Sequence, residues 1–218
     1  MEYCVSVFDY IPPNTHYVQR VTFFEHTIET LVTNTPSSVD TWISETERLH
    51  SFCPYLSTLV GLDVEWRPNQ TRNSENPVAT LQLCFGRRCL VFQILHSPSI
   101  PQSLLNFLRN PSHRFAGVGI ENDVEKLRRD YNLEVAKTVD LRTVAAERYG
   151  VRELRNAGLK QLAWRVLGRE ISKPESVTRS MWDDQYLTPA QVQYAAIDAF
   201  LSFEIGRVLG LGESEFVI

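Results

Sequence analysis

The 218-residue chain carries 26 acidic and 22 basic side chains, and its formal net charge is −4. This balance excludes a general basic coat for non-specific nucleic-acid binding, but it is compatible with a local basic groove beside an acidic site. Apolar residues make up 43% of the sequence, close to the globular average, so the chain can bury the core of one domain.

The start of the chain and its cysteines indicate in which cellular compartment the protein is expected. Residues 1–14 have neither the basic start nor the long apolar run of a secretory signal. No apolar stretch approaches the roughly 20 residues that span a bilayer. The four cysteines, Cys4, Cys53, Cys84 and Cys89, form no CxxC pair and no zinc-ligand pattern with histidine. We therefore expect a soluble intracellular protein with buried thiols, located in the nucleus, the cytoplasm or both.

The first half of the chain predicts two hairpins, a helix and a further strand. The strands alternate apolar and polar side chains with period two, whereas the helix repeats apolar residues at helical spacing. In chain order we expect a leader over 1–17, a hairpin of 17–24 with 26–33, a helix over 38–50, a strand over 58–66, a polar loop over 67–77 and a hairpin of 78–85 with 88–94.

The second half predicts helices that alternate with strands. Helices are expected over 101–110, 121–131, 142–150, 159–168 and 187–210, and strands over 114–119 and 136–141. The last helix has a clear start, because Thr188 can cap it and Gln191 completes a capping box. This order predicts an α/β fold with a mixed β-sheet flanked by helices, over residues 18–212, and a tail over 213–218.

The expected strand "VGLDVEW", residues 60–66, places two acids in an apolar run. Residues two apart on a strand share a face, so Asp63 and Glu65 lie opposite Leu62 and Val64. Gly61 shares the acidic face and leaves space beside them. Two bare carboxylates this close repel by roughly 3–4 kcal/mol at an effective dielectric of 20. The pair therefore needs a partner of positive charge.

Two further acids occur at comparable positions. Asp123 lies in the first turn of the expected helix 121–131, directly after a strand. Asp198 lies in "YAAIDAF", in the middle of the last helix, where a charged group among apolar neighbours needs a partner or an ion. Tyr194 precedes Asp198 by four residues and shares its helix face.

Four converging carboxylates without histidine or cysteine favour Mg²⁺ or Mn²⁺ over zinc. Two such ions, about 3.5–4 Å apart, form the arrangement that catalyses in-line displacement at phosphorus. The sequence thus predicts a metal site built from Asp63, Glu65, Asp123 and Asp198.

The acidic segments also resemble a known family. "GLDVEW", "GVGIENDVEKL" and "YAAIDA" resemble, in order and spacing, the three exonuclease motifs of the DEDD superfamily, the last in the Tyr-x-x-x-Asp form of the tyrosine subclass. The likeness is greatest to Werner-type 3′-5′ exonuclease domains, which also have a Trp at the position of Trp66, and it extends over about residues 20–210. The short chain is also similar to plant stand-alone members. The resemblance implies a ribonuclease H-like fold.

The resemblance also implies a role for each site residue. Asp63 would bridge two metal ions, Glu65 and Asp198 would hold the first ion, and Asp123 would hold the second. Tyr194 would orient the attacking water. The implied activity is a metal-dependent 3′-5′ exonuclease that hydrolyses single-stranded RNA or DNA to nucleoside 5′-monophosphates.

Other residues have competing interpretations. Asp140 is a rival acid at a strand end, to which we assign the capping of the helix that begins near Arg142. Trp66 could stack on a terminal base, although core packing is the more common role of such a residue. Lys173 and Arg179 belong to a polar segment that could line a groove, so we expect them to contact phosphates.

Two alternatives to catalysis follow from the same fold. The chain could be an inactive nucleic-acid-binding module, or a scaffold that uses the fold for protein contacts. As partners we expect single-stranded nucleic acid with a free 3′ end, other proteins that supply targeting, and further copies of the chain in a homo-oligomer.

Overall fold

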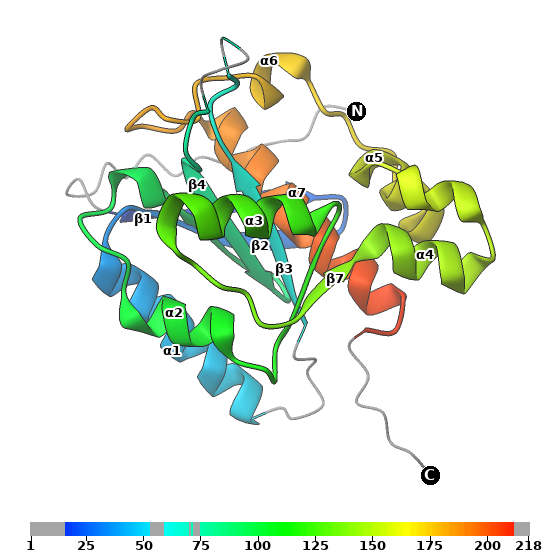
Figure 1. Cartoon of the computed structure of the whole chain (residues 1–218), viewed down its shortest axis with the longest axis horizontal. Helices are drawn as coiled ribbons and strands as arrows, with labels where there is room; N and C mark the ends of the chain where they lie inside the picture. The colour runs from blue at the N-terminus through cyan, green and yellow to red at the C-terminus, as the bar shows by residue number, and fades with distance from the viewer. Residues whose placement is uncertain (1–15, 53–58, 70, 72–74, 212–218) are drawn as a thin grey trace.

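A seven-stranded sheet forms the centre of the computed structural model, which describes residues 16–52, 59–69, 71 and 75–211 (Figure 1). The strands are β1 (His16–Phe23), β2 (His26–Thr33), β3 (Leu59–Glu65), β4 (Thr80–Phe85), β5 (Arg88–Phe92), β6 (Arg114–Gly117) and β7 (Thr138–Asp140). Their order in space is β1-β2-β5-β4-β3-β6-β7. The pairs β2–β5, β3–β6 and β6–β7 are parallel, and the other neighbours are antiparallel. The expected mixed sheet is confirmed.

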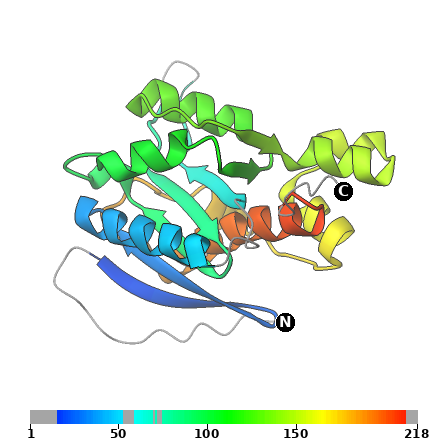
Figure 2. The same cartoon turned by 90° about the horizontal axis from the view of Figure 1, so that it is seen from below.

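Helices cover both faces of this sheet. They are α1 (Pro36–Phe52), α2 (Gln102–Arg109), α3 (Ile120–Tyr131), α4 (Leu141–Tyr149), α5 (Leu159–Leu162), α6 (Glu175–Thr178) and α7 (Pro189–Val208), with short 3-10 turns η1 (Ile94–His96) and η2 (Arg152–Asn156) and a π-helical turn η3 (Ala163–Leu167). In Figure 1, α1, α2 and α3 lie on the near side of the sheet and α7 lies behind it. In Figure 2 the β1–β2 hairpin, dark blue, forms one edge of the sheet.

The observed elements match the expected ones with small shifts at their ends. The largest difference is the expected helix 159–168, which changes from α to π geometry at Ala163 and ends at Gly168. The sequence pattern did not predict α6, η1 or η2, which are single turns. Residues 1–15 of the expected leader and all of the tail 213–218 lie outside the described residues, so those boundaries stay predictions.

The two faces of β3 pack against different helices. Val60, Leu62 and Val64 join the apolar cluster formed with α1, α2 and α3. Leu59, on the opposite face, joins the cluster formed with α4, α5 and α7. Asp63 and Glu65 alternate with Leu62 and Val64, so they lie on the α7 face, as the period of two predicts.

Gly61 lets α7 approach β3 at close range. A Cβ atom at this position would lie 2.0 Å from the carbonyl oxygen of Ala199 and 2.6 Å from the backbone nitrogen of Phe203. Only glycine avoids both collisions. The contact places the middle of α7, and with it Asp198, directly over the strand that carries the other acids.

The start of α7 has the predicted cap. The Thr188 hydroxyl accepts the N–H of Gln191, and the Gln191 side chain accepts the N–H of Thr188, which completes the capping box. Most of the helix is buried, including Asp198. Within the described part of the chain, no helix is long and apolar enough to cross a membrane.

The β4–β5 hairpin brings two cysteines together. Cys84 and Cys89 are directly opposed in the strand register, and both are buried free thiols. This agrees with the expectation of unpaired, buried cysteines around the turn at Gly86. Cys4 and Cys53 lie outside the described residues.

Candidate metal centre

Three carboxylates meet where β3 passes beneath α7. Asp63, Glu65 and Asp198 each offer a carboxylate oxygen, and these three atoms lie within 4.8 Å of one another. Asp63 and Glu65 come from one face of β3, and Asp198 comes from the buried centre of α7. Residues separated by more than 130 positions in the sequence therefore form one group of oxygen ligands, which fits a hard divalent cation.

The crowding of these acids changes their proton affinity. Burial, followed by the charge of Asp198, raises the pKa of Asp63 to about 7. Burial and then the charge of Asp63 raise the pKa of Glu65 well above its usual range. The pKa of Asp198 is also raised by burial, although Lys173 opposes the shift. Acids with such raised pKa values favour either protons or metal ions beside them.

Asp123 lies beside this group, in the first turn of α3. The turn from β6 into the helix passes through Gly119, whose φ of 72° is readily adopted only by glycine. Burial, and next the charge of Asp63, raises the pKa of Asp123 to about 8. Asp123 is therefore close enough to interact electrostatically with Asp63, although it is outside the group of three that lie within 4.8 Å.

Lys173 supplies a positive charge to the group. Its Nζ lies 2.5 Å from Oδ2 of Asp198 and 5.0 Å from the ring centroid of Tyr194. Burial acts to lower the pKa of Lys173, but the charges of Asp198, Tyr194 and Asp63 outweigh it and raise that pKa. The sequence predicted a phosphate contact for Lys173, whereas the structure pairs its ammonium with a carboxylate of the site.

Tyr194 lies one turn before Asp198 on α7, as predicted. Tyr194 acts to lower the pKa of Asp198, and the charge of Asp198 acts to raise that of Tyr194, so the two groups interact electrostatically. Burial and then the charge of Asp198 raise the pKa of Tyr194 to about 12, so the phenol keeps its proton near neutral pH. Tyr194 can therefore donate a hydrogen bond, but it cannot act as a base under these conditions.

The segment that carries Lys173 is anchored on the start of α7. Trp182 is fully buried, its ring centroid lies 5.9 Å from that of Tyr194, and its Nε1 donates to the Thr178 carbonyl. The Gln191 side chain donates to Ser180 Oγ at 2.9 Å. A cavity of ≈ 210 Å³ lies between residues 171–177 and α7, with Tyr194 and Asp198 on its wall.

The remaining predicted residues lie as follows. Trp66 is half-buried and packs against the apolar cluster of α1, α2 and α3, in agreement with the packing interpretation. Arg179 is exposed and pairs with Glu175 at 3.0 Å, at the end of α6. Asp140 caps α4 by accepting the N–H of Arg142 at 2.9 Å, so its predicted structural role is confirmed.

Sequence reasoning missed the residues of α3 that hold the chain next to the site. Lys126, Asp130 and Tyr131 of α3 bind the chain that connects β3 to β4. The spacing of Lys126 and Asp130, four residues apart on the helix that carries Asp123, was the available signal. Their partners in the loop are about 50 residues away in the sequence, and no local pattern identifies them.

The raised carboxyl pKa values predict that the metal-free protein loses stability as the pH rises. Aspartic acids titrate near pH 4 when unfolded, whereas Asp63 and Asp123 titrate at about 7 and about 8 in the folded chain. Between these values the folded state holds more protons, so the free energy of unfolding falls with increasing pH. With EDTA present, we expect a lower melting temperature at about pH 8.5 than at about pH 5.5.

Added Mn²⁺ should remove most of this difference, because the ions replace the protons. An Asp123→Asn variant should show a weaker pH dependence in EDTA. Scanning calorimetry at several pH values measures both effects. A melting temperature that rises between these two pH values without metal would contradict the prediction.

The fold and the site together define a class of protein. A mixed sheet with helices on both faces carries, on its central strand and the helix packed over it, an acidic site suited to divalent cations. This is the arrangement of ribonuclease H-like nucleases that the resemblance implied.

Comparison with known proteins identifies the family. A family model described as 3′-5′ exonuclease matches residues 40–210. The bifunctional 3′-5′ exonuclease/ATP-dependent helicase WRN of Mus musculus is 37% identical over 158 residues, 72% of this chain. A 3′-5′ exonuclease of Arabidopsis thaliana is 35% identical over 152 residues, 69% of this chain. The chain belongs to the 3′-5′ exonuclease family, and the expected membership is confirmed.

Solved structures confirm the fold. RNase D of Escherichia coli has a TM-score of 0.66 at 20% identity, over 83% of this chain and 44% of RNase D. The Nibbler EXO domain of Aedes aegypti has a TM-score of 0.67 at 17% identity, over 88% of this chain and 90% of that domain. The chain matches only 11% of the length of mouse WRN and 52% of the Arabidopsis protein.

Proposed function

We propose that this chain is a metal-dependent 3′-5′ exonuclease that shortens single-stranded RNA or DNA from a free 3′ end and releases nucleoside 5′-monophosphates. The observation that carries the proposal is the meeting of Asp63, Glu65 and Asp198 in a chain of the 3′-5′ exonuclease family. The names of the mouse and Arabidopsis relatives support the 3′-5′ polarity.

Two Mg²⁺ or Mn²⁺ ions complete the proposed site. The donor set fits them, because it consists of carboxylate oxygens whose mutual repulsion needs positive charge. Asp63 would be shared by both ions, Glu65 and Asp198 would hold the first, and Asp123 would hold the second. When bound, such ions offset the charge of the phosphodiester and favour the attack of water at phosphorus.

Tyr194 and Lys173 would act on the reacting groups directly. The Tyr194 phenol, which stays protonated near neutral pH, would hold the attacking water by a hydrogen bond. The Lys173 ammonium balances Asp198 in the metal-free chain. Once cations neutralise the carboxylates, this ammonium is available to contact a phosphate oxygen of the substrate.

Trp66 and Arg179 would bind parts of the nucleic acid other than the phosphate that reacts. Trp66 follows Glu65 directly and is half-buried, so its accessible part can stack on a terminal base. Arg179 is exposed on the segment that carries Lys173, where it can contact a backbone phosphate. Neither contact distinguishes the sequence of the bases.

Matched oligonucleotides test the proposal. The purified chain is incubated with single-stranded RNA and DNA of the same sequence, each labelled at the 5′ or the 3′ end, with Mg²⁺ or Mn²⁺. We expect 5′-labelled strands to shorten stepwise and 3′-labelled strands to release a labelled mononucleotide at once. Chromatography against standards identifies that product as a nucleoside 5′-monophosphate.

The Asp198→Asn variant is the control for this experiment, since it keeps the shape of the residue and removes a metal ligand. It should leave all substrates intact. Equal digestion by the variant, cleavage at internal positions or release from the 5′ end would refute the proposal. If the wild-type chain itself leaves the substrates intact but binds the strand measurably, the inactive binding module is supported instead.

The assembly and location of the chain stay predictions from the sequence. We infer a homo-oligomer, protein partners that supply targeting, and a location in the nucleus, the cytoplasm or both. Light scattering on the eluted peak of a gel filtration column checks the first of these, and a monomer mass at every concentration would exclude it.

A further inference from the structure

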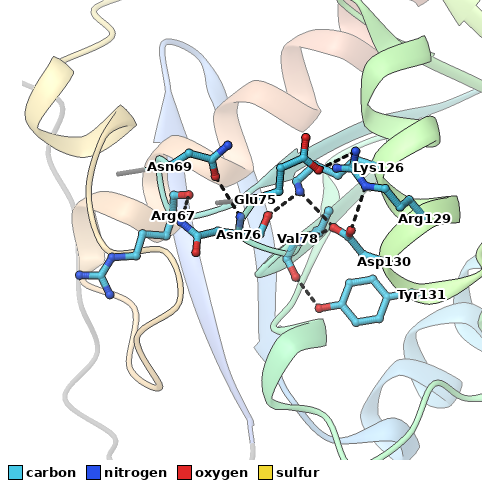
Figure 3. Close-up of polar contacts among 9 residues, drawn as sticks. All are labelled: Arg67, Asn69, Glu75, Asn76, Val78, Lys126, Arg129, Asp130 and Tyr131. Carbon is cyan, nitrogen blue, oxygen red and sulfur yellow. Dashed lines mark hydrogen bonds and ion pairs between the residues drawn. The ribbon is translucent and has the colours of Figure 1, made fainter. Parts of the chain in front are cut away.

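Residues of α3 hold the chain that leaves β3 (Figure 3). Lys126 and Asp130 follow Asp123 by three and seven residues, so the three side chains lie along one face of α3. Lys126 Nζ donates to the carbonyl of Asn76 at 2.5 Å and lies 3.1 Å from Asp130 Oδ2. The loop between β3 and β4 is thus tied to α3 through a buried ion pair.

Further contacts of α3 lead to the backbone of Glu65. Asp130 accepts the N–H of Val78 at 2.9 Å, and the Tyr131 hydroxyl donates to the Val78 carbonyl at 2.5 Å. Ala79, the next residue, donates its N–H to the carbonyl of Glu65 at 2.8 Å. A continuous series of contacts therefore joins the helix of Asp123 to the strand end that carries Glu65.

The loop also has contacts across its two arms. The Asn76 side chain donates to the carbonyls of Arg67 and Pro68 at 3.0 and 3.2 Å, and its N–H donates to Asn69 Oδ1 at 2.9 Å. Arg67 pairs with Asp183 at 3.0 Å, on the segment that precedes α7. Among the described residues of the loop, both arms are thus held to each other and to neighbouring elements.

Lys126 is placed to support the loop and not to bind substrate. Only 7% of the residue is exposed, so its ammonium cannot meet a phosphate that arrives from solvent. The ammonium also lies 5.2 Å from the ring centroid of Trp66. An ammonium has three N–H donors, and a carbonyl, a carboxylate and an aromatic face surround this one.

We propose that Lys126, Asp130 and Tyr131, here called the α3 clamp, are positioning residues that fix Glu65 and Trp66 relative to Asp123. This inference rests on the proposed exonuclease function, because it assigns the α3 clamp a role in aligning the metal ligands of that reaction. Loss of the α3 clamp frees the loop. The carboxylate of Glu65 on β3 then no longer keeps its distance from that of Asp123 on α3.

The charge of Asp130 supports this role. Burial alone would raise the pKa of Asp130, but the hydrogen bonds from Val78 and Lys126 hold it below its usual value. The carboxylate is therefore ionised near neutral pH, and all its contacts in the α3 clamp are present under the conditions of the reaction.

Three variants test the α3 clamp: Lys126→Met, Asp130→Asn and Tyr131→Phe, the last of which removes a single hydroxyl and should fold in any case. Hydrogen exchange of the peptide that spans residues 66–80 should become about tenfold faster or more in the first two variants. Turnover of a single-stranded oligonucleotide should fall about 10- to 100-fold with a KM changed by less than about threefold. Mn²⁺ affinity, measured by electron paramagnetic resonance, should fall several-fold.

Arg128→Met and Tyr149→Phe are the matched controls, because both residues are exposed and outside the α3 clamp. They should change none of the three measurements. Lost turnover with unchanged loop exchange would overturn the proposal, and so would faster exchange with unchanged turnover and Mn²⁺ affinity. If the wild-type chain degrades no oligonucleotide, the proposed function fails, while loop exchange and Mn²⁺ affinity still decide whether the α3 clamp aligns the site.

Discussion

The Asp63→Asn substitution should abolish nuclease activity and at the same time stabilise the metal-free protein. Activity should fall by about three orders of magnitude or more, because the variant loses a ligand for both proposed ions. The free energy of unfolding without metal should rise by about 1 kcal/mol or more, since one of the repelling carboxylates becomes neutral. The melting temperature in EDTA should then increase by about 2–4 °C at about pH 8.5, where Asp63 of the wild type is ionised.

The exposed acid Glu147, on α4, provides the control. Glu147→Gln also removes one negative charge, but it should change neither activity nor melting temperature appreciably. Calorimetry in EDTA and digestion of a labelled oligonucleotide in Mn²⁺ measure the two effects. An active Asp63→Asn variant, or one that melts earlier than the wild type without metal, would contradict the account of the site.

The Gly61→Ala substitution should disrupt both the fold and the site, although it adds only one methyl group. The new Cβ would lie 2.0 Å from the Ala199 carbonyl oxygen, and both atoms belong to backbone that cannot rotate away. Either β3 or α7 must move, which separates Asp198 from Asp63. We expect a loss of stability of about 3 kcal/mol or more, at the upper end of overpacking effects.

Gly158→Ala is the matched control for this prediction. Among the described residues, no atom lies within 4 Å of a Cβ added at Gly158, and its φ of −81° suits any residue. This variant should change the free energy of unfolding by less than about 1 kcal/mol. Urea titration of both variants gives the comparison, and a Gly61→Ala protein of wild-type stability would show that α7 does not pack on β3 as described.

Local patterns predicted much of this molecule. The period of two in residues 60–66 placed Asp63 and Glu65 on the face of Gly61, and the structure has them there. The capping box of Thr188 and Gln191 and the capping role of Asp140 depend on residues two or three positions apart, so the sequence alone contains them. The resemblance of three acidic motifs to the DEDD superfamily implied the ribonuclease H-like fold, and the solved structures confirm it.

Contacts between distant residues could not be predicted in the same way. The parallel pairing of β2 with β5 depends on the path of the intervening chain and not on the composition of either strand. The ion pair of Lys173 with Asp198 joins residues 25 positions apart, and the bond between Val78 and Asp130 joins residues 52 apart. Each is decided by packing, which brings together side chains whose neighbours in sequence give no sign of the contact.

The position of α7 in the chain has a consequence for biosynthesis. This helix covers the sheet face of Leu59 and Gly61, yet it follows all seven strands in the sequence. While the ribosome makes the protein, that apolar surface stays uncovered until residues 189–208 have left the exit tunnel. Transiently exposed apolar surface favours aggregation, so the nascent chain is prone to aggregate during this interval.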